Sequence, residues 1–544
     1  MARPTRLRRD AGVIGILYVA LGSTIGSGWL FGALHAAVQA GPWSVFSWII
    51  GAASVLSLAF VFAELTTMFP NSGALVHMTH VSHGDLTGKI WSWILFLTSV
   101  SVPPVEVSAV LTYANNYLPG LIHPQTGMMT ATGTTAAVLV LAAVVALNFL
   151  AIRWVIAINS AATWWKLIIP VATIGVLMAY SFHPQNMLAH VHSTPLSGVF
   201  TAVATAGVVF SFFGFQQAIA LAGETRDPGR YMPIALISSV LISMLVYVGL
   251  QVSFITALQP GELSGGWAHL RFSGMFGPLA AIAMAAGAFW WAVLLYVDAL
   301  ISPLGTAFIY VTSSPRVIMA AGEMGTAPKQ VVRLSRQGVP WVGLIVTYFV
   351  GVLFFFPFPS WQKLVSAVSL VAVLSFSIGP VILLRLRSAL PQAPRPFRLR
   401  AAGLVSTVAF IVSNWIIYWT GYGIVRWMLG AVFVYIFAYL SWHLAVRRRP
   451  LADLGWRHAW WIPPYLGGMW LISSLGPAGT MGGTGAFGFF TGMWIIAGFS
   501  LVVLWAAVAA GQGSQAAQRC AEFVKTLASS GVESPTRSQE LEVP

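Results

Sequence analysis

The sequence contains a single cysteine, Cys520, and charged residues make up only 8% of its 544 residues. One cysteine excludes a disulfide within the chain and argues against a cysteine-ligated metal site. Soluble domains usually carry roughly 25% charged residues, so the low charge argues against a soluble protein. The sequence also lacks a phosphate-binding loop, a nucleophile motif and a cluster of metal ligands in its hydrophobic stretches. It therefore gives no support to an enzyme, and we expect no metal and no bound cofactor.

Hydrophobic residues make up 57% of the chain and fall in long runs, each close to or above the roughly 20 residues that cross a bilayer as a helix. These runs predict an all-α polytopic membrane protein with fourteen spans, at residues 11–37, 42–68, 90–118, 130–150, 154–181, 198–224, 231–257, 276–311, 338–357, 361–384, 403–423, 426–446, 460–476 and 484–510. The span at 460–476 is short and contains Pro463 and Pro464, so twelve helices plus a re-entrant or tilted pair is the alternative.

The net charge of +14 follows a membrane topology rather than a nucleic-acid-binding surface. If the N-terminus is cytoplasmic, 24 of the 28 Lys and Arg residues fall in cytoplasmic segments, three fall outside and Lys166 lies within the membrane. This positive-inside pattern places the N-terminal segment 1–10 and the tail 511–544 in the cytoplasm. The first span is too long for a signal-peptide core, so we expect it to remain as a helix in the cell membrane. The tail predicts a short helix followed by disorder.

Two of the predicted spans are interrupted near their midpoints by glycine-containing segments. The first interruption reads Gly22-Ser-Thr-Ile-Gly-Ser-Gly28, and the second reads Ser211-Phe-Phe-Gly-Phe-Gln-Gln217. A break inside the bilayer leaves backbone groups unpaired unless protein, ligand or water pairs them, so a break marks a binding site. Matching breaks in two halves of a chain are typical of secondary transporters that bind their substrate near the midplane.

The ten-helix core, residues 11–390, divides into two five-helix units, about 11–181 and 198–386, and each unit opens with its interrupted helix. An odd number of helices inverts the second unit relative to the first, which allows alternating access as one unit rocks against the other. The helices at 403–510 are additional to this repeat. Their aromatic residues are typical of lipid anchors, and they predict no oligomeric state.

Unwinding at the first break exposes amide N–H groups at the positive end of a half-helix, which suits a carboxylate. Unwinding near Phe213 and Gly214 frees carbonyl groups that accept from an ammonium group. Together the breaks favour a zwitterionic substrate. The alternative is that Gly26 and Gly28 form a small-residue packing face, since Gly22 and Gly26 are four residues apart as in helix association motifs.

The residues around the breaks resemble the amino acid–polyamine–organocation superfamily of permeases over roughly residues 10–390. The resemblance rests on four segments in order: Gly22 to Gly28; Ala63-Glu-Leu-Thr-Thr-Met-Phe-Pro-Asn-Ser-Gly73; Phe210-Ser-Phe-Phe-Gly-Phe215 with Gly223-Glu-Thr-Arg-Asp-Pro-Gly-Arg-Tyr-Met-Pro233; and Ser314-Pro-Arg316 through Pro328 to Gly338-Val-Pro340. It implies a leucine-transporter-like fold of two inverted five-helix repeats and an amino-acid substrate. The segment Pro103-Pro104-Val-Glu106 is similar to the aspartate–proton symporter-like members.

The resemblance also implies roles for residues in the breaks. Ser27 and the amides near Gly28 would hold the α-carboxylate of the substrate. The carbonyl groups of Ile25, Ser211 and Phe213 would hold its α-ammonium group. Phe210 would then match the gating aromatic residue of the family.

An ionisable residue inside the membrane is a functional hypothesis by default, and Lys166 lies in the middle of the fifth span. It is similar to the lysine of proton-coupled members that occupies the sodium position of their relatives, with Thr306 on the opposite wall. The alternative is a structural ion pair with Asp298 or Glu106. Each of these carboxylates could carry a proton, pair with Lys166 or face the substrate side chain. We expect Glu106 near the substrate and Asp298 in a structural or proton-relay role.

Other ionisable residues receive structural interpretations. Glu64 is expected to be a gate or capping partner for Arg226, Arg230 or Arg316. His77, His80 and His83 recur every three residues in a predicted cytoplasmic loop, which predicts a pH-titrating or solvated stripe rather than a metal site.

The sequence thus predicts a secondary transporter that takes up an amino acid across the cytoplasmic membrane by proton symport, with the proton as coupling ion. An amino-acid exchanger on the same fold is the alternative. A non-transporting amino-acid sensor is a third class, for which a large soluble signalling domain would be expected.

Overall fold

The computed structural model describes residues 11–530 apart from 71–73, 150–151, 271, 273–276, 324–326, 328, 336–338, 446–447, 449 and 451–453. Helices form nearly all of the regular structure in these residues, and the β contacts are two isolated bridges, Ala11 with Thr225 and Ile122 with Met129. This confirms the predicted all-α polytopic class. The predicted N-terminal segment 1–10 and the end of the predicted tail, 531–544, lie outside the described residues.

The first predicted unit comprises α1 (Val13–Thr24), α2 (Gly28–Ala40), α3 (Ser44–Met68), α4 (Ala74–Ala114), α5 (Ala131–Leu147) and α6 (Ile152–Tyr180). α4 is longer than the predicted span at 90–118, because the chain before it is also helical. Gly84 has φ 76° and ψ −167°, which separates an N-terminal arm from the long membrane helix. A positive φ favours glycine, so this residue permits the turn between the two parts.

The second predicted unit comprises α7 (Leu196–Thr205), α8 (Phe215–Ala220), α9 (Pro228–Ala257), α10 (Pro278–Ala285), α11 (Phe289–Glu323), α12 (Trp341–Leu353) and α13 (Trp361–Ala389). The single predicted span at 276–311 is wrong, because Gly287 has φ 85° and divides the apolar run into α10 and α11. The hydrophobicity is continuous across this turn, so the sequence pattern alone did not reveal it. α11 continues twelve residues beyond the predicted end, to Glu323.

Spans at equivalent places in the two units pack against each other: the broken spans meet through α1 on α8 and α2 on α7, and α3 packs on α9, α4 on α11 and α5 on α12. Other contacts also occur in matching pairs. α4 packs on α13, and their counterparts α11 and α6 also pack on each other. Likewise α1 packs on α9, and their counterparts α7 and α3 pack on each other. A two-fold axis between the units would produce paired contacts of this kind, and the inverted repeat stays a prediction.

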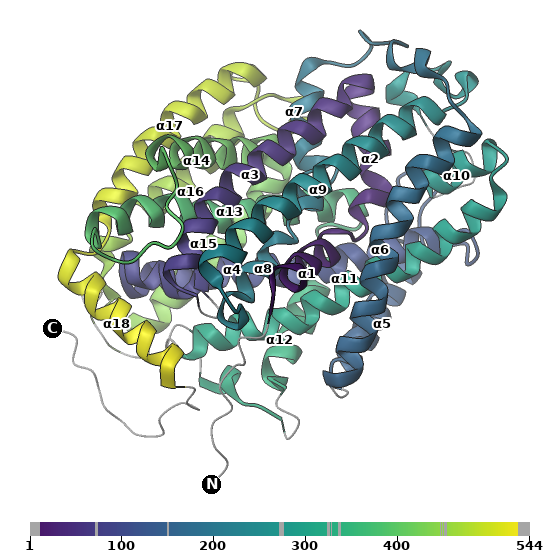
Figure 1. Ribbon diagram of the computed structural model, residues 1–544. Coiled ribbons are helices and arrows are strands. Elements are labelled where there is room, and N and C mark those ends of the chain that lie inside the picture. The colour runs from purple at the N-terminus through teal and green to yellow at the C-terminus, as the bar shows by residue number, and fades with distance from the viewer. Residues whose placement is uncertain are drawn as a thin grey trace.

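Five helices follow the repeat: α14 (Ala402–Trp419), α15 (Tyr422–Ala445), α16 (Ile462–Leu475), α17 (Phe489–Ala510) and α18 (Ser514–Ser530). α14, α16 and α17 lie together on one side of the molecule, away from α5 and α6 (Figure 1). α18 confirms the short helix predicted in the tail.

Nine helical segments of the described chain are long and apolar enough to cross a membrane when α2 and α3 count together, and ten if the bent pair α7 and α8 forms one span. α1, α5 and α12 are apolar but shorter. α16, in the predicted thirteenth span, has 14 residues, fewer than the roughly 20 of a straight crossing. The total of twelve to fourteen spans therefore stays a prediction.

Candidate functional site

The first predicted break is present between α1 and α2. α1 ends at Thr24, Ile25 is extended with ψ 91°, and α2 begins at Gly28. The side chain of Glu106 in α4 fills the gap, because its Oε2 accepts a hydrogen bond of 2.8 Å from the Ser27 amide. Ser27 and Glu106 are both fully buried. The break thus presents an amide to a carboxylate, and in this structure the carboxylate belongs to the protein.

Glycine allows Glu106 and its neighbours to approach the break closely. A Cβ on Gly26 would lie 2.4 Å from Glu106 Oε1 and 3.0 Å from Thr306 Oγ1. A Cβ on Gly22 would lie 2.7 Å from Thr163 Oγ1 in α6. Gly22 is therefore a packing glycine, whereas Gly26, which the alternative interpretation placed in a packing face, lines a buried polar site.

The second break joins α7 to α8 through a bend of 52°. It begins earlier than predicted, because α7 ends at Thr205 and Gly207 has φ 85°. Phe210 and Ser211 form part of a short 3-10 turn, and both are buried. Phe213 is also buried, and its ring meets that of Phe376 edge-on at 5.7 Å between centroids.

Glycines also bring the two breaks together. A Cβ on Gly28 would lie 2.1 Å from Ser211 Oγ, and one on Gly214 would lie 2.3 Å from the Thr24 amide nitrogen. The predicted substrate-binding residues from the two units therefore occupy one region of the protein.

Lys166 connects the first break to α11. Its Nζ donates to the Gly22 carbonyl oxygen at 2.9 Å and to Thr306 Oγ1 at 2.7 Å. The Thr306 hydroxyl in turn donates to the Ile25 carbonyl oxygen at 3.3 Å. Lys166 is 1% exposed, and no described carboxylate oxygen lies within 4.0 Å of its Nζ. The alternative of a direct ion pair is therefore not realised in this conformation.

Asp298 lies two turns before Thr306 on α11 and is fully buried. Its Oδ1 accepts hydrogen bonds from Trp165 Nε1 at 2.9 Å and from Ser302 Oγ at 2.6 Å. Its Oδ2 has no hydrogen-bond partner among the described residues, and neither has Glu106 Oε1. Unpaired carboxylate oxygens are costly to bury, so both mark sites where a proton, water or ligand can bind.

Trp361, at the start of α13, is a site residue that sequence reasoning missed. Its Nε1 donates to Ser27 Oγ at 2.9 Å. Its ring stacks on His35 with a centroid distance of 5.4 Å and lies 4.9 Å from the Phe31 centroid. A tryptophan at the end of a span is usually an interfacial anchor, so the sequence gave no signal of this contact.

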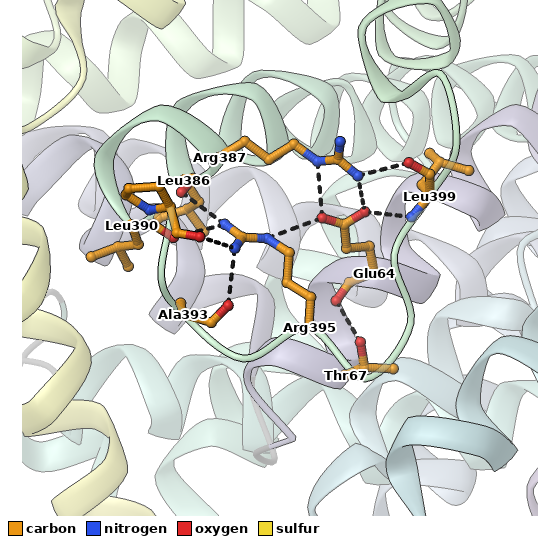
Figure 2. A network of polar contacts seen from close by, with 9 residues as sticks. Glu64, Thr67, Leu386, Arg387, Leu390, Ala393, Arg395 and Leu399 are labelled. Atoms are coloured by element: carbon orange, nitrogen blue, oxygen red, sulfur yellow. Dashed lines mark hydrogen bonds and ion pairs between the residues drawn. The ribbon is translucent and has the colours of Figure 1, made fainter.

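The expected partners of Glu64 are wrong. Figure 2 shows Arg387 of α13 and Arg395 of the following loop both pointing at its carboxylate. Arg387 Nε donates to Oε1 at 3.0 Å, Arg395 Nε lies 3.3 Å from Oε1, and the Leu399 amide donates to Oε2 at 2.8 Å. Burial lowers the pKa of Arg395 below its ordinary value, although the Glu64 charge opposes this.

The three arginines that were expected to pair with Glu64 are instead exposed. Glu64 lies near the end of α3, which packs on α13. Its partners therefore come from a segment more than 300 residues later in the chain.

The predicted solvated stripe is also wrong, because His77 and His83 are buried in the arm of α4. His83 Nε2 contacts the Ala507 carbonyl oxygen at 2.9 Å, and its Nδ1 contacts Ser82 Oγ at 2.8 Å. The C-terminal helices cover this arm, which the local sequence did not indicate. The described residues contain no group of three or more potential metal ligands.

Broken helices that meet at a buried polar centre are the architecture of a secondary transporter. The family model described as amino acid permease matches residues 12–442, and the chain belongs to this family. This confirms the resemblance seen in the sequence. The protein is thus a membrane-embedded transporter of amino acids and not an enzyme.

Curated relatives align along nearly the whole chain. The Glutamate/serine transporter AimA of Bacillus subtilis (strain 168) is 33% identical over 512 residues, 92% of this chain and 94% of that protein. The Aspartate-proton symporter of the same organism is 29% identical over 485 residues, 88% of this chain and 92% of that protein. The Branched-chain amino acid permease BcaP of that strain is 25% identical over 453 residues.

Proposed function

We propose that this protein takes up an amino acid across the cytoplasmic membrane by proton symport, with both termini in the cytoplasm. The name of one relative, Aspartate-proton symporter, supports the coupling ion, and that of another, Glutamate/serine transporter, supports small polar or acidic amino acids as the substrate class. The proton is the coupling ion, and no metal or other cofactor is invoked. Alternating access follows from the repeated units and their paired contacts.

In this proposal the first break binds the substrate α-carboxylate at the Ser27 and Gly28 amides. Carbonyl oxygens at Ile25, Ser211 and Phe213 bind its α-ammonium group. Gly26 and Gly214 allow the groups of the two breaks to lie close together, and Phe210 closes the site. The substrate carboxylate competes with a group already present, because Glu106 accepts from the Ser27 amide.

Charge repulsion connects this competition to proton uptake. Two carboxylates about 4 Å apart repel by roughly 4 kcal/mol at an effective dielectric constant of 20. Protonation of Glu106 removes this repulsion and weakens its hold on the amide. An acidic or zwitterionic substrate therefore binds best when Glu106 has gained a proton.

The observation that carries the coupling proposal is the bridge from Lys166 to the end of α1. Its ammonium group contacts the Gly22 carbonyl oxygen in the last turn of α1, where the helix dipole is negative. Loss of the proton weakens this attraction and releases the break from α6. The charge on Lys166 thereby controls whether the half-helix can move.

The test is uptake of radiolabelled glutamate, aspartate, serine and branched-chain amino acids into proteoliposomes, with and without an inward proton gradient. We expect accumulation that requires only the gradient. Lys166→Ala should retain substrate exchange but lose gradient-driven accumulation, whereas Lys363→Ala, a matched change at an exposed lysine, should behave as the unmodified protein. Gradient-driven accumulation by Lys166→Ala would contradict the assigned role. Uptake that occurs only into preloaded vesicles would identify an exchanger.

A further inference from the structure

A row of polar side chains, which we call the polar seam, runs along α4 and α11 from the predicted outer surface toward Lys166. It consists of Asn116, Tyr113, Tyr296 and Asp298. At its outer end Asn116 Nδ2 donates to the Tyr296 hydroxyl at 3.1 Å. Next to it, Tyr117 is 70% exposed and its ring meets that of Tyr296 edge-on at 5.4 Å. The seam therefore begins at the surface of the protein.

The inner half of the seam contains two buried polar atoms without a partner. The Tyr113 ring meets that of Tyr296 at 5.6 Å, and the side chain is 1% exposed. Neither the Tyr113 hydroxyl nor Asp298 Oδ2 has a hydrogen-bond partner among the described residues. Tyr113 lies on α4 and Asp298 on α11, and these two helices pack against each other. Unpaired polar groups of this kind, one from each helix, form a place where a proton or water can be held.

The hydrogen bonds that hold the Asp298 side chain all reach the same carboxylate oxygen. Trp165 and Ser302 both donate to Oδ1, which leaves Oδ2 unpaired. Trp165 precedes Lys166 in α6, so its hydrogen bond places Asp298 beside the residue next to the coupling lysine, although Asp298 and Lys166 form no ion pair within 4.0 Å. Asp298 thus stands between the surface end of the seam and the coupling lysine.

We propose that the polar seam is the route by which an external proton reaches Lys166, with Asp298 as the relay. This inference rests on the proposed function. An external hydronium ion transfers its proton to the Asp298 carboxylate, which becomes a neutral carboxylic acid. The acid then passes this proton to the neutral Lys166 amine, which becomes an ammonium group, and Asp298 returns to a carboxylate.

The seam lies beside the cover over the substrate site and touches it through Tyr113. Above Ser27 the cover consists of Trp361, Phe31 and His35, which are packed ring against ring. Tyr113 contacts Phe31 on one side, at 5.3 Å between ring centroids, and Tyr296 on the other. A proton can therefore enter along α4 and α11 while the aromatic cover stays closed.

Other titratable groups near Asp298 are few. α5 and α10 carry none among their helical residues. The elements packed around α11 carry Lys166 and Tyr180 in α6, Glu106 and Tyr113 in the membrane part of α4, Tyr348 in α12 and Tyr18 in α1, and α11 itself carries Tyr296 and Tyr310. Their other titratable residues, which include Arg153, Arg316, Glu323, Lys329 and those of the α4 arm, lie several helical turns along the chain from this region. Of the nearer groups, Lys166 and Glu106 belong to the substrate and coupling centre, and a phenol is a far weaker acid than a carboxyl group. Asp298 is therefore the group in the seam that can exchange a proton at the working pH.

The experiment measures two activities of the full-length protein in proteoliposomes: proton influx during substrate uptake, from an internal pH dye, and substrate exchange into preloaded vesicles without a gradient. Asp298→Asn keeps an acceptor for Trp165 and Ser302 but cannot carry the proton. We expect it to lose proton influx and gradient-driven uptake by about tenfold or more, with exchange retained. Tyr113→Phe, which removes only the hydroxyl, should slow proton influx. Asp227→Asn, the matched change at an exposed aspartate, should alter neither activity.

Proton influx in Asp298→Asn that equals that of the unmodified protein would overturn the relay. A changed substrate preference with intact proton influx would overturn it as well, because Asp298 would then face the substrate side chain. If Asp298→Asn fails to fold, undiminished proton influx in Tyr113→Phe overturns the route. If the unmodified protein shows exchange but no gradient-driven uptake, both the relay and the proposed symport are wrong.

Discussion

Gly214 is a residue at which an added methyl group should damage both the stability of the protein and the site. In Gly214→Ala the new Cβ would meet the Thr24 amide nitrogen at 2.3 Å and the Ala20 carbonyl oxygen at 2.5 Å. Both are backbone atoms of α1, so a rotamer change cannot relieve the contact. Ordinary contact requires the helices to separate by about 1 Å, and such overpacking costs about 1–3 kcal/mol or more.

The displacement would also reach the site, because Ile25 and Ser27 directly follow the end of α1. A shift of about 1 Å in a binding geometry can reduce a rate by about a hundredfold. We therefore expect Gly214→Ala to melt at a lower temperature in detergent and to transport at a small fraction of the normal rate.

Gly15→Ala is the matched control, because a Cβ on Gly15 has no atom within 4 Å. Gly15 lies within α1, where alanine is favoured over glycine by about 1 kcal/mol, so this variant should be as stable as the unmodified protein or more so. Equal melting temperatures and uptake rates for the two variants would refute the close contact between the breaks.

Three further changes test separate parts of the site. Trp361→Phe removes the donor to the Ser27 hydroxyl, and the loss of about 1 kcal/mol should weaken substrate affinity about fivefold with little effect on stability. Unchanged affinity in a binding titration would exclude Trp361 from the site. Glu64→Gln leaves two arginines around a neutral amide and should destabilise the protein by about 3 kcal/mol, which a melting curve in detergent would detect. An unaltered curve would show that the ion pairs of Glu64 contribute little to stability. Thr306→Val removes the hydroxyl that connects Lys166 to the Ile25 carbonyl oxygen and should abolish gradient-driven uptake, whereas Thr306→Ser should retain it. Equal proton coupling in both variants would contradict a role for the hydroxyl.

The sequence located the site but not the contacts that close it. The breaks were predictable because glycine and polar residues interrupt apolar runs at equivalent places in two units. The interaction of Lys166 with Thr306 was suggested by the family resemblance and is present as a hydrogen bond of 2.7 Å. By contrast, Ser27 meets Glu106 from 79 residues away and Trp361 from 334 residues away. Such pairs depend on how the helices pack, and a single sequence contains no signal of that.

The errors have a common physical cause. Hydrophobicity is continuous through Gly287, so one span was predicted where a turn divides α10 from α11. The polar arm that carries His77 and His83 looked like a solvated loop, because its cover comes from the C-terminal helices. In both cases the prediction used only the local pattern of polar and apolar residues, whereas the structure depends on a turn or a contact with the rest of the chain.

The Thr306 hydroxyl has a single hydrogen, and the protonation state of Lys166 determines which neighbour can accept it. It is donated to the Ile25 carbonyl oxygen, so Thr306 can only accept from Lys166, whose ammonium group has no lone pair. A neutral Lys166 amine has a lone pair and can accept the hydroxyl hydrogen instead. Thr306 would then rotate away from Ile25, and the link through Thr306 from Lys166 to that carbonyl oxygen would be broken. One proton on Lys166 can therefore decide whether α6 and α11 are tied to the first break, which is the release that the proposed symport assigns to the loss of this proton.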